Sequence, residues 1–64
     1  MFIEFTREDT KKSICVNPDY VETITEWNKD GKMVTQIALT SGEFWNLVES
    51  YTDVWSRIEP EIGG

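Results

Sequence analysis

The feature that most constrains this chain is the spacing of apolar residues in its last third. From residue 44 to residue 58 they recur at intervals of three and four, which places them on one stripe of a helix. The stripe consists of Phe44, Leu47, Val48, Tyr51, Val54, Trp55 and Ile58. Residues 43–59 are therefore predicted to form one amphipathic helix, which must cover the apolar face of another element.

Two signals set the ends of this helix. Residues 40–43 (Thr-Ser-Gly-Glu) fit a capping box, in which Glu43 reaches back to the free amides of the first turn. Pro60 cannot continue a helix, so the helix is expected to end before it. Residues 1–60 are expected to form a single small domain, and residues 61–64 are expected to form a flexible C-terminal tail.

The residues ahead of this segment are typical of antiparallel strands. Residues 2–17 contain two alternating runs and are predicted to form a first hairpin, which Pro18 ends. Residues 20–27 and 33–39 flank Asp30-Gly31, and this dipeptide favours a tight second hairpin because glycine adopts positive φ at low cost. Val21 and Ile24 break the alternation of their run, which predicts a bend or bulge between them.

The predicted fold class is α+β: a small antiparallel sheet of three to four strands in two hairpins, with one amphipathic C-terminal helix packed on one face. Phe44, Trp55 and Ile58 are expected in the core. The opposite sheet face is expected to stay open and to carry Val34 or Ala38. The helix is expected to cover Ile3, Phe5, Ile14, Val16, Ile37 and Leu39.

Charge and composition exclude several classes of function. Twelve acidic and six basic residues give a net charge of −6, which repels phosphate backbones, so no direct binding to nucleic acid is expected. Without histidine there can be no Ser-His-Asp or Cys-His catalysis and no imidazole ligand for a metal. The single cysteine, Cys15, cannot form an internal disulfide or a thiolate cage. The chain is expected not to be an enzyme, with no catalytic residues, cofactor or metal.

The sequence also bears on location. Its start lacks the positive and apolar regions of a signal peptide. The longest uncharged stretch, residues 33–42, is too short and too polar to span a bilayer. A lone Cys15 within an apolar strand pattern fits a reducing compartment. A cytoplasmic protein without membrane insertion is therefore expected.

The remaining expectation is binding to another protein. Trp27, Trp45 and Tyr51 lie at the margins of the predicted apolar faces, and Trp and Tyr are the side chains that most often anchor interfaces. Glu49 and Asp53 lie on the polar face of the predicted helix. These five residues are predicted to contact the partner. The leading hypothesis is a non-enzymatic, small acidic protein that acts through protein–protein binding, with a homodimer through the open sheet face or an edge strand as one arrangement.

An alternative from another class is a phage or mobile-element inhibitor whose acidic face mimics nucleic acid on a basic target protein. This hypothesis needs carboxylates spaced like phosphates, and the candidate row consists of Glu43, Glu49, Asp53, Glu59 and Glu61. Binding through exposed carboxylates would be screened by salt, whereas contacts through aromatic anchors would persist.

The order of several short motifs resembles that of the FlbD-type flagellar and swarming motility proteins, which are of similar length. The matching pieces are Phe5-Thr6-Arg7, residues 17–24, residues 37–42, and Glu49-Ser50 followed by Val54 and Ile58.

The resemblance implies a setting in bacterial motility and a different local structure near the C-terminus. It implies a fifth strand over residues 43–48 and a shorter helix that begins near Ser50, where residues 50–53 form a second acceptable capping box. The polar stripe through Asn46, Glu49 and Asp53 favours the single helix instead.

Overall fold

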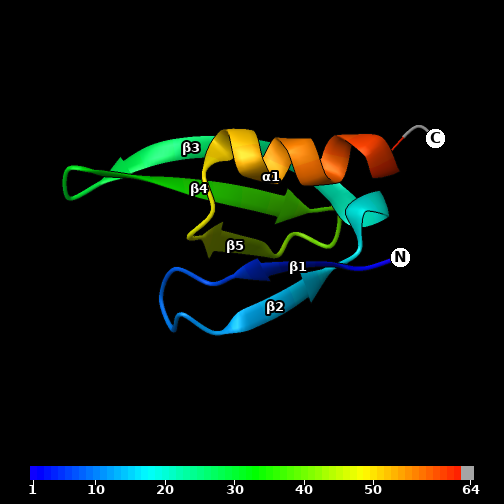
Figure 1. The fold of residues 1–64 in the computed structure, drawn as a ribbon, viewed down its shortest axis with the longest axis horizontal. Coiled ribbons are helices and arrows are strands. Elements are labelled where there is room, and N and C mark those ends of the chain that lie inside the picture. The colour runs from blue at the N-terminus through cyan, green and yellow to red at the C-terminus, as the bar shows by residue number, and fades with distance from the viewer. Residues whose placement is uncertain (63–64) are drawn as a thin grey trace.

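The computed structural model describes residues 1–62 and shows a small α+β fold with two antiparallel sheets and one C-terminal α-helix (Figure 1). This confirms the predicted fold class. The elements in chain order are β1 (Ile3–Thr6), β2 (Ser13–Val16), the 3-10 helix η1 (Pro18–Tyr20), β3 (Val21–Lys29), β4 (Lys32–Leu39), β5 (Phe44–Leu47), α1 (Tyr51–Ile58) and the 3-10 helix η2 (Glu59–Glu61).

The two sheets are joined side by side through β5. Strands β1 and β2 form one sheet, and the other has the order β3-β4-β5. The amide of Val48 donates to the carbonyl of Thr6, and the amide of Glu8 donates to the carbonyl of Asn46, both at 2.8 Å. Figure 1 accordingly shows β5 between β4 and β1. These bonds connect the first hairpin to the second.

Both predicted hairpins are present, and so is the predicted irregularity. Lys29 pairs with Lys32 around a two-residue turn in which Asp30 and Gly31 have φ of 53° and 82°. Positive φ at both positions is what the tight turn between twisted strands requires. The register of β3 against β4 shifts between residues 21 and 23, which makes Glu22 the extra residue of a β-bulge.

The prediction of one helix over residues 43–59 is wrong in its first half. Residues 44–47 form β5, in which Trp45 pairs with Ile37 and Leu47 pairs with Thr35 on β4. The helix begins only at Tyr51. The strand and the shorter helix are the elements that the family resemblance implied for this segment.

The physical reason lies in the turn before β5. Residues 40–43 do not cap a helix but reverse the chain after β4: the amide of Leu39 donates to the carbonyl of Glu43 at 2.8 Å, and Gly42 has φ of 96°. This turn places the next residues alongside β4, where an extended conformation lets the backbone groups of both strands form hydrogen bonds with each other. The helix cap is Ser50, whose hydroxyl accepts a hydrogen bond from the amide of Asp53 at 3.2 Å.

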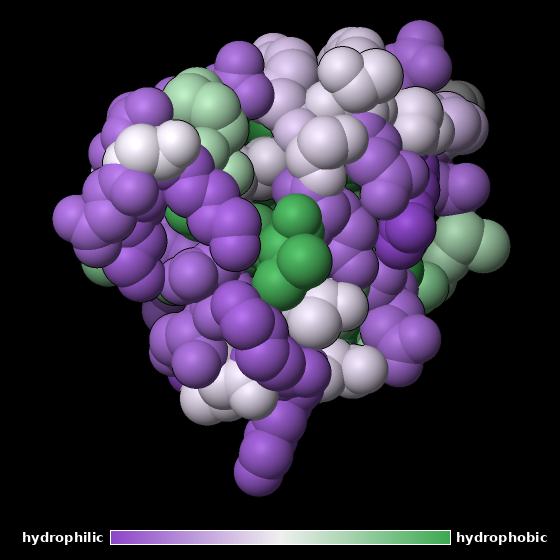
Figure 2. Space-filling view, turned by 60° about the vertical axis from the view of Figure 1, so that its left-hand side comes forward, coloured by the Kyte–Doolittle hydropathy of each residue, from purple (hydrophilic) through white to green (hydrophobic). Residues whose placement is uncertain are grey.

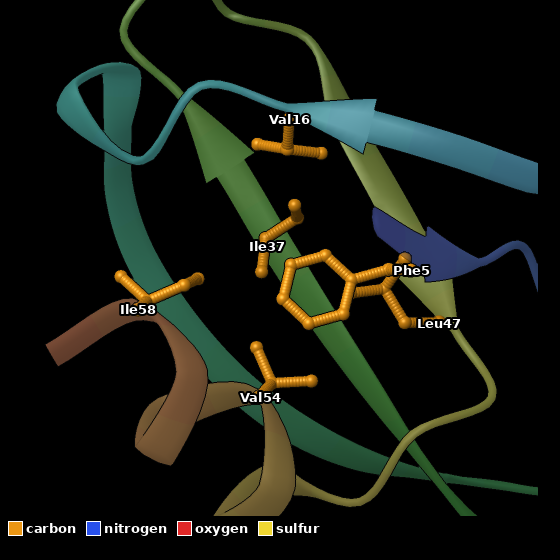
Figure 3. Close-up of a cluster of buried hydrophobic side chains, with 6 residues drawn as sticks. All are labelled: Phe5, Val16, Ile37, Leu47, Val54 and Ile58. Atoms are coloured by element: carbon orange, nitrogen blue, oxygen red, sulfur yellow. The ribbon is translucent and has the colours of Figure 1, made fainter. Parts of the chain in front are cut away.

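The core is formed by side chains from four strands and the helix, which converge in Figure 3. Its members are Phe5, Val16, Ile37, Leu47, Val54 and Ile58. Ile3, Ile14 and Leu39 pack against it, half-buried. The residues predicted beneath the helix therefore form the core or its margin.

Three burial predictions are wrong. Phe44, predicted in the core, is 61% exposed because strand alternation turns it away from the face that carries Trp45. Trp55, also predicted in the core, is 43% exposed on a flank of α1. Val34, predicted on an open face, is only 3% exposed because the first hairpin approaches that face, where Val34 and Glu8 line the same small hollow.

Candidate functional site

One flank of α1 rests on the first hairpin. Val54 and Ile58 are fully buried, so they define the side of the helix that faces the sheet. On one flank, Arg57 donates two hydrogen bonds to the Asp53 carboxylate, at 3.0 and 3.2 Å. Arg57 also donates to the carbonyl of Glu4 on β1 at 3.2 Å. This flank therefore contacts β1 through Arg57.

The opposite flank lies over a hollow. Helical geometry places Tyr51 and Trp55 about a quarter turn from Val54, on the side away from Arg57. They are 40% and 43% exposed, and Ile62, which follows η2, is 38% exposed. They share a hollow of about 200 Å³ with β3. This hollow, here named the α1–β3 groove, is lined by Val21, Glu22, Ile24, Tyr51, Trp55, Ile58 and Ile62.

The groove adjoins the outer edge of β3. In the order β3-β4-β5, β3 has a strand neighbour on one side only within residues 1–62, so its other edge presents unpaired backbone groups. Val21, Glu22 and Ile24 belong both to this edge strand and to the groove lining. Apolar side chains and backbone hydrogen-bonding groups therefore lie next to each other.

The charge around the groove is negative. Glu22 is the one charged side chain among the described residues that line it, and Glu26 is exposed farther along β3. Glu59 and Glu61 lie in η2, directly before Ile62. The basic residue of β3, Lys29, forms an ion pair with Glu8 at 2.9 Å. The site combines apolar lining with an acidic border.

A larger hollow at the turn between β4 and β5 has a different character. It measures about 350 Å³ and is lined by Tyr20, Leu39, Thr40, Ser41 and Glu43. The amide of Thr40 donates to the carbonyl of Tyr20 at 2.8 Å, so backbone groups there already have a partner. We regard the α1–β3 groove as the better candidate because it combines two aromatic side chains with an open strand edge.

The three predicted aromatic anchors lie in different places. Tyr51 lines the groove. Trp27 is directly paired with Val34, on the sheet face opposite to α1, and its indole donates to the Asn46 side chain at 3.1 Å. Trp45 is half-buried against the core, and the Arg7 guanidinium lies 4.9 Å from the centre of its ring.

The two predicted carboxylates make contacts within the chain. Glu49 follows β5 and accepts hydrogen bonds from the amide and the hydroxyl of Thr6, both at 3.0 Å. Partial burial acts to raise the pKa of Glu49, but hydrogen bonds from Thr6 and from the Glu49 amide outweigh it and hold the pKa below 4.5. Asp53 is paired with Arg57. The structure does not bring the five predicted residues together.

The proposed row of carboxylates is not built on one helix. Glu43 precedes β5, Glu49 lies between β5 and α1, and Asp53 is in the first turn of α1. Glu59 and Glu61 belong to η2. The even spacing expected from a single helical face is therefore absent from this part of the chain.

Sequence reasoning missed Trp55, Ile62 and Glu22 as site residues. The available signal was spacing: positions 51, 55, 58 and 62 follow one helical stripe, displaced from Val54. The predicted flexible tail is described only in part, since Glu61 ends η2 and Ile62 lines the groove. Residues 63 and 64 lie outside the described residues.

Figure 2 shows a face from the side of the long β3–β4 hairpin. Hydrophilic side chains cover most of this face, and the hydrophobic ones lie apart from one another. This face does not offer one broad apolar patch.

The described part of the chain has no helix with the length and apolar character needed to cross a membrane. Comparisons with protein-family models, with curated proteins and with solved structures found no match.

Proposed function

We propose that this protein acts by binding another protein and that the α1–β3 groove is its contact surface. The observation that carries the proposal is the exposure of Tyr51, Trp55 and Ile62 side by side over a hollow next to an unpaired strand edge. Removing such apolar surface from water favours association, and aromatic side chains over a hollow are typical interface anchors.

The chemistry of the groove supports a binding role. Its lining is apolar except for the backbone, Glu22, the Tyr51 hydroxyl and the Trp55 indole N–H, so it suits apolar side chains and the backbone of a polypeptide. A phosphate or another anion would be repelled by Glu22 and by the surrounding acidic residues. We propose that the role of this surface is binding and not catalysis.

Mimicry of nucleic acid has less support. The net charge of −6 is compatible with a basic target, but the five carboxylates come from separate elements and two are engaged with Thr6 and Arg57. Binding by mimicry would collapse at high ionic strength, whereas binding in the groove would persist. The resemblance to FlbD-type proteins suggests bacterial motility as the setting, and the expected compartment is the cytoplasm.

Site-specific photo-crosslinking in the source cells tests the proposal. A benzoylphenylalanine placed at Tyr51 keeps an aromatic ring at the groove, and the same group at Phe44 probes a more exposed aromatic position outside it. We expect a discrete adduct with another protein from position 51 and none from position 44. Adducts from position 44 alone, or no adduct from position 51, would contradict the proposal.

A further inference from the structure

We infer that the partner segment is a basic, extended strand that pairs with the free edge of β3 beneath the outer flank of α1. This inference rests on the proposed function and specifies the ligand of the same groove. It follows from three properties of the site: the position of the helix relative to the sheet, the length of the groove, and the sign of its charge.

The position of α1 leaves room for one more strand. Helix α1 packs over β3 and β4. Its Arg57 side chain points toward β1, so the flank that carries Tyr51 and Trp55 faces the outer side of β3. Beneath that flank the structure has a hollow. A strand added to β3 would fill it.

The groove fits a short segment. Helix α1 has eight residues, or about 12 Å, and a strand rises about 3.3 Å per residue. About four strand residues therefore lie beneath α1, and about five if the contact reaches Ile62. Because strand side chains alternate, every second residue of the segment would face Tyr51, Trp55 and Ile62, and the others would face away from α1.

The charge selects a basic segment. Glu22 and Glu26 are exposed on β3 and the chain has a net charge of −6, so the site attracts a cationic segment and repels an anionic one. A segment that alternates apolar residues with lysine or arginine would place its apolar residues under α1, and its cations on the other face would be attracted by the negative field of the protein.

The same charge disfavours a second copy of this chain as the occupant. A second copy would bring another net charge of −6. In an antiparallel pairing of two β3 strands centred on Ile24, Glu22 of each copy would lie opposite Glu26 of the other. The bulge at Glu22 also interrupts the regular edge that self-pairing would use.

To test this inference, an end-capped octapeptide of alternating valine and lysine is titrated into the full chain. Binding is measured from changes in the amide chemical shifts and in the Trp fluorescence of the protein. We expect shifts in β3 and in α1, and a dissociation constant at least tenfold larger for the Trp55→Ala variant. The Phe44→Ala variant is the matched control and should bind like the wild type. Replacing the lysines by glutamate should weaken binding at least tenfold. Each variant is first checked for a folded amide spectrum.

Two methylated peptides test strand pairing directly. In a strand, the N–H groups of alternate residues point to opposite edges, so N-methylation of all valines or of all lysines blocks one edge only. One of the two methylated peptides should lose binding at least tenfold, and the other should retain it. Equal binding of both, with shifts still at Tyr51 and Trp55, would overturn strand pairing while leaving the groove as the contact surface.

Other outcomes separate the two proposals. Shifts confined to residues outside the groove would contradict both. Absence of binding at millimolar peptide would overturn the basic strand as ligand, and the photo-crosslinks from position 51 would then decide the proposed function separately. A dimer in sedimentation without peptide, with protected β3 amides, would identify a second copy as the occupant and overturn the inference.

Discussion

The Glu49 carboxylate accepts hydrogen bonds from both the amide and the hydroxyl of Thr6, each at 3.0 Å, across 43 positions of sequence. These bonds fix the connection between β5 and α1 against β1. Glu49 was predicted to be a partner-binding residue on a helix, and the structure gives its carboxylate an internal role.

Replacing Glu49 by glutamine should lower the free energy of unfolding by about 0.5–1 kcal/mol at pH 7, a value reduced for partial exposure. The pKa of Glu49 is lowered in the folded state. The contribution of the Glu49 carboxylate to the free energy of unfolding is therefore fully present above its pKa in the unfolded state, about 4.5. It is lost as the pH falls through its pKa in the folded state. Urea unfolding at pH 7 and pH 3 measures this, and the difference between the proteins should shrink at pH 3. A difference independent of pH would contradict the assignment.

Leu47 and Val48 provide a test of β5. Both belong to the predicted helical stripe, but in the structure Leu47 is buried and Val48 is 52% exposed. Leu47→Ala should cost about 2–5 kcal/mol, which is a large part of the stability of a domain this small. Val48→Ala should change stability by less than about 0.5 kcal/mol. Thermal or urea unfolding measures both, and similar losses would argue for a continuous helix.

The stability of the turn between β3 and β4 should depend on the backbone conformation of Gly31. Gly31 has φ of 82°, and no heavy atom lies within 4 Å of a methyl group added there. Gly31→Ala should therefore be destabilising by about 1 kcal/mol through backbone strain and not through a clash. Asp30→Gly is the control, because glycine tolerates the φ of 53° at that position. It should be close to neutral in urea unfolding, and an equal loss in both variants would contradict this explanation.

The pKa of Glu8 should lie below the ordinary value for a glutamate. Its pKa is lowered first by the hydrogen bond from Lys29, and then by the charges of Lys29 and Lys11. Carboxyl NMR of the wild type should give a Glu8 pKa below 4.5, and Lys29→Met should raise it more than Lys11→Met does. A Glu8 pKa unaffected by Lys29→Met would show that the ion pair does not form in solution.

The two hairpins could be predicted from the sequence because turn residues and strand alternation are local patterns. Asp30-Gly31 fixes the register of β3 against β4, and alternation identifies Phe5 and Ile37 as inward residues. The segment after Gly42 was misassigned because the spacing of Leu47, Val48 and Tyr51 fits a helical stripe, although the segment contains a strand and a short helix. The strand forms because β4 has a free edge at this place, with which residues 44–47 can pair. Such a tertiary contact cannot be inferred from a local sequence pattern.

The candidate site was harder to predict, because it depends on where one element ends relative to another. Tyr51 was identified from its position at the margin of a stripe. Trp55 was assigned to the core because sequence spacing cannot show which strands α1 covers. Trp27 and Trp45 were chosen on the same ground as Tyr51, but their positions depend on which sheet face each strand residue occupies.

Strand β5 has a consequence for how the protein is made. Asn46 of β5 and Val48 directly after it make the hydrogen bonds that join the first hairpin to the second, and Val54 and Ile58, which close the core, follow them in the chain. A growing polypeptide that has emerged only as far as β4 can form the two hairpins, but it lacks the hydrogen bonds and the core side chains that hold them together. Stable folding should therefore wait until α1 has left the ribosome, and cooperativity should be acquired in one step at that point.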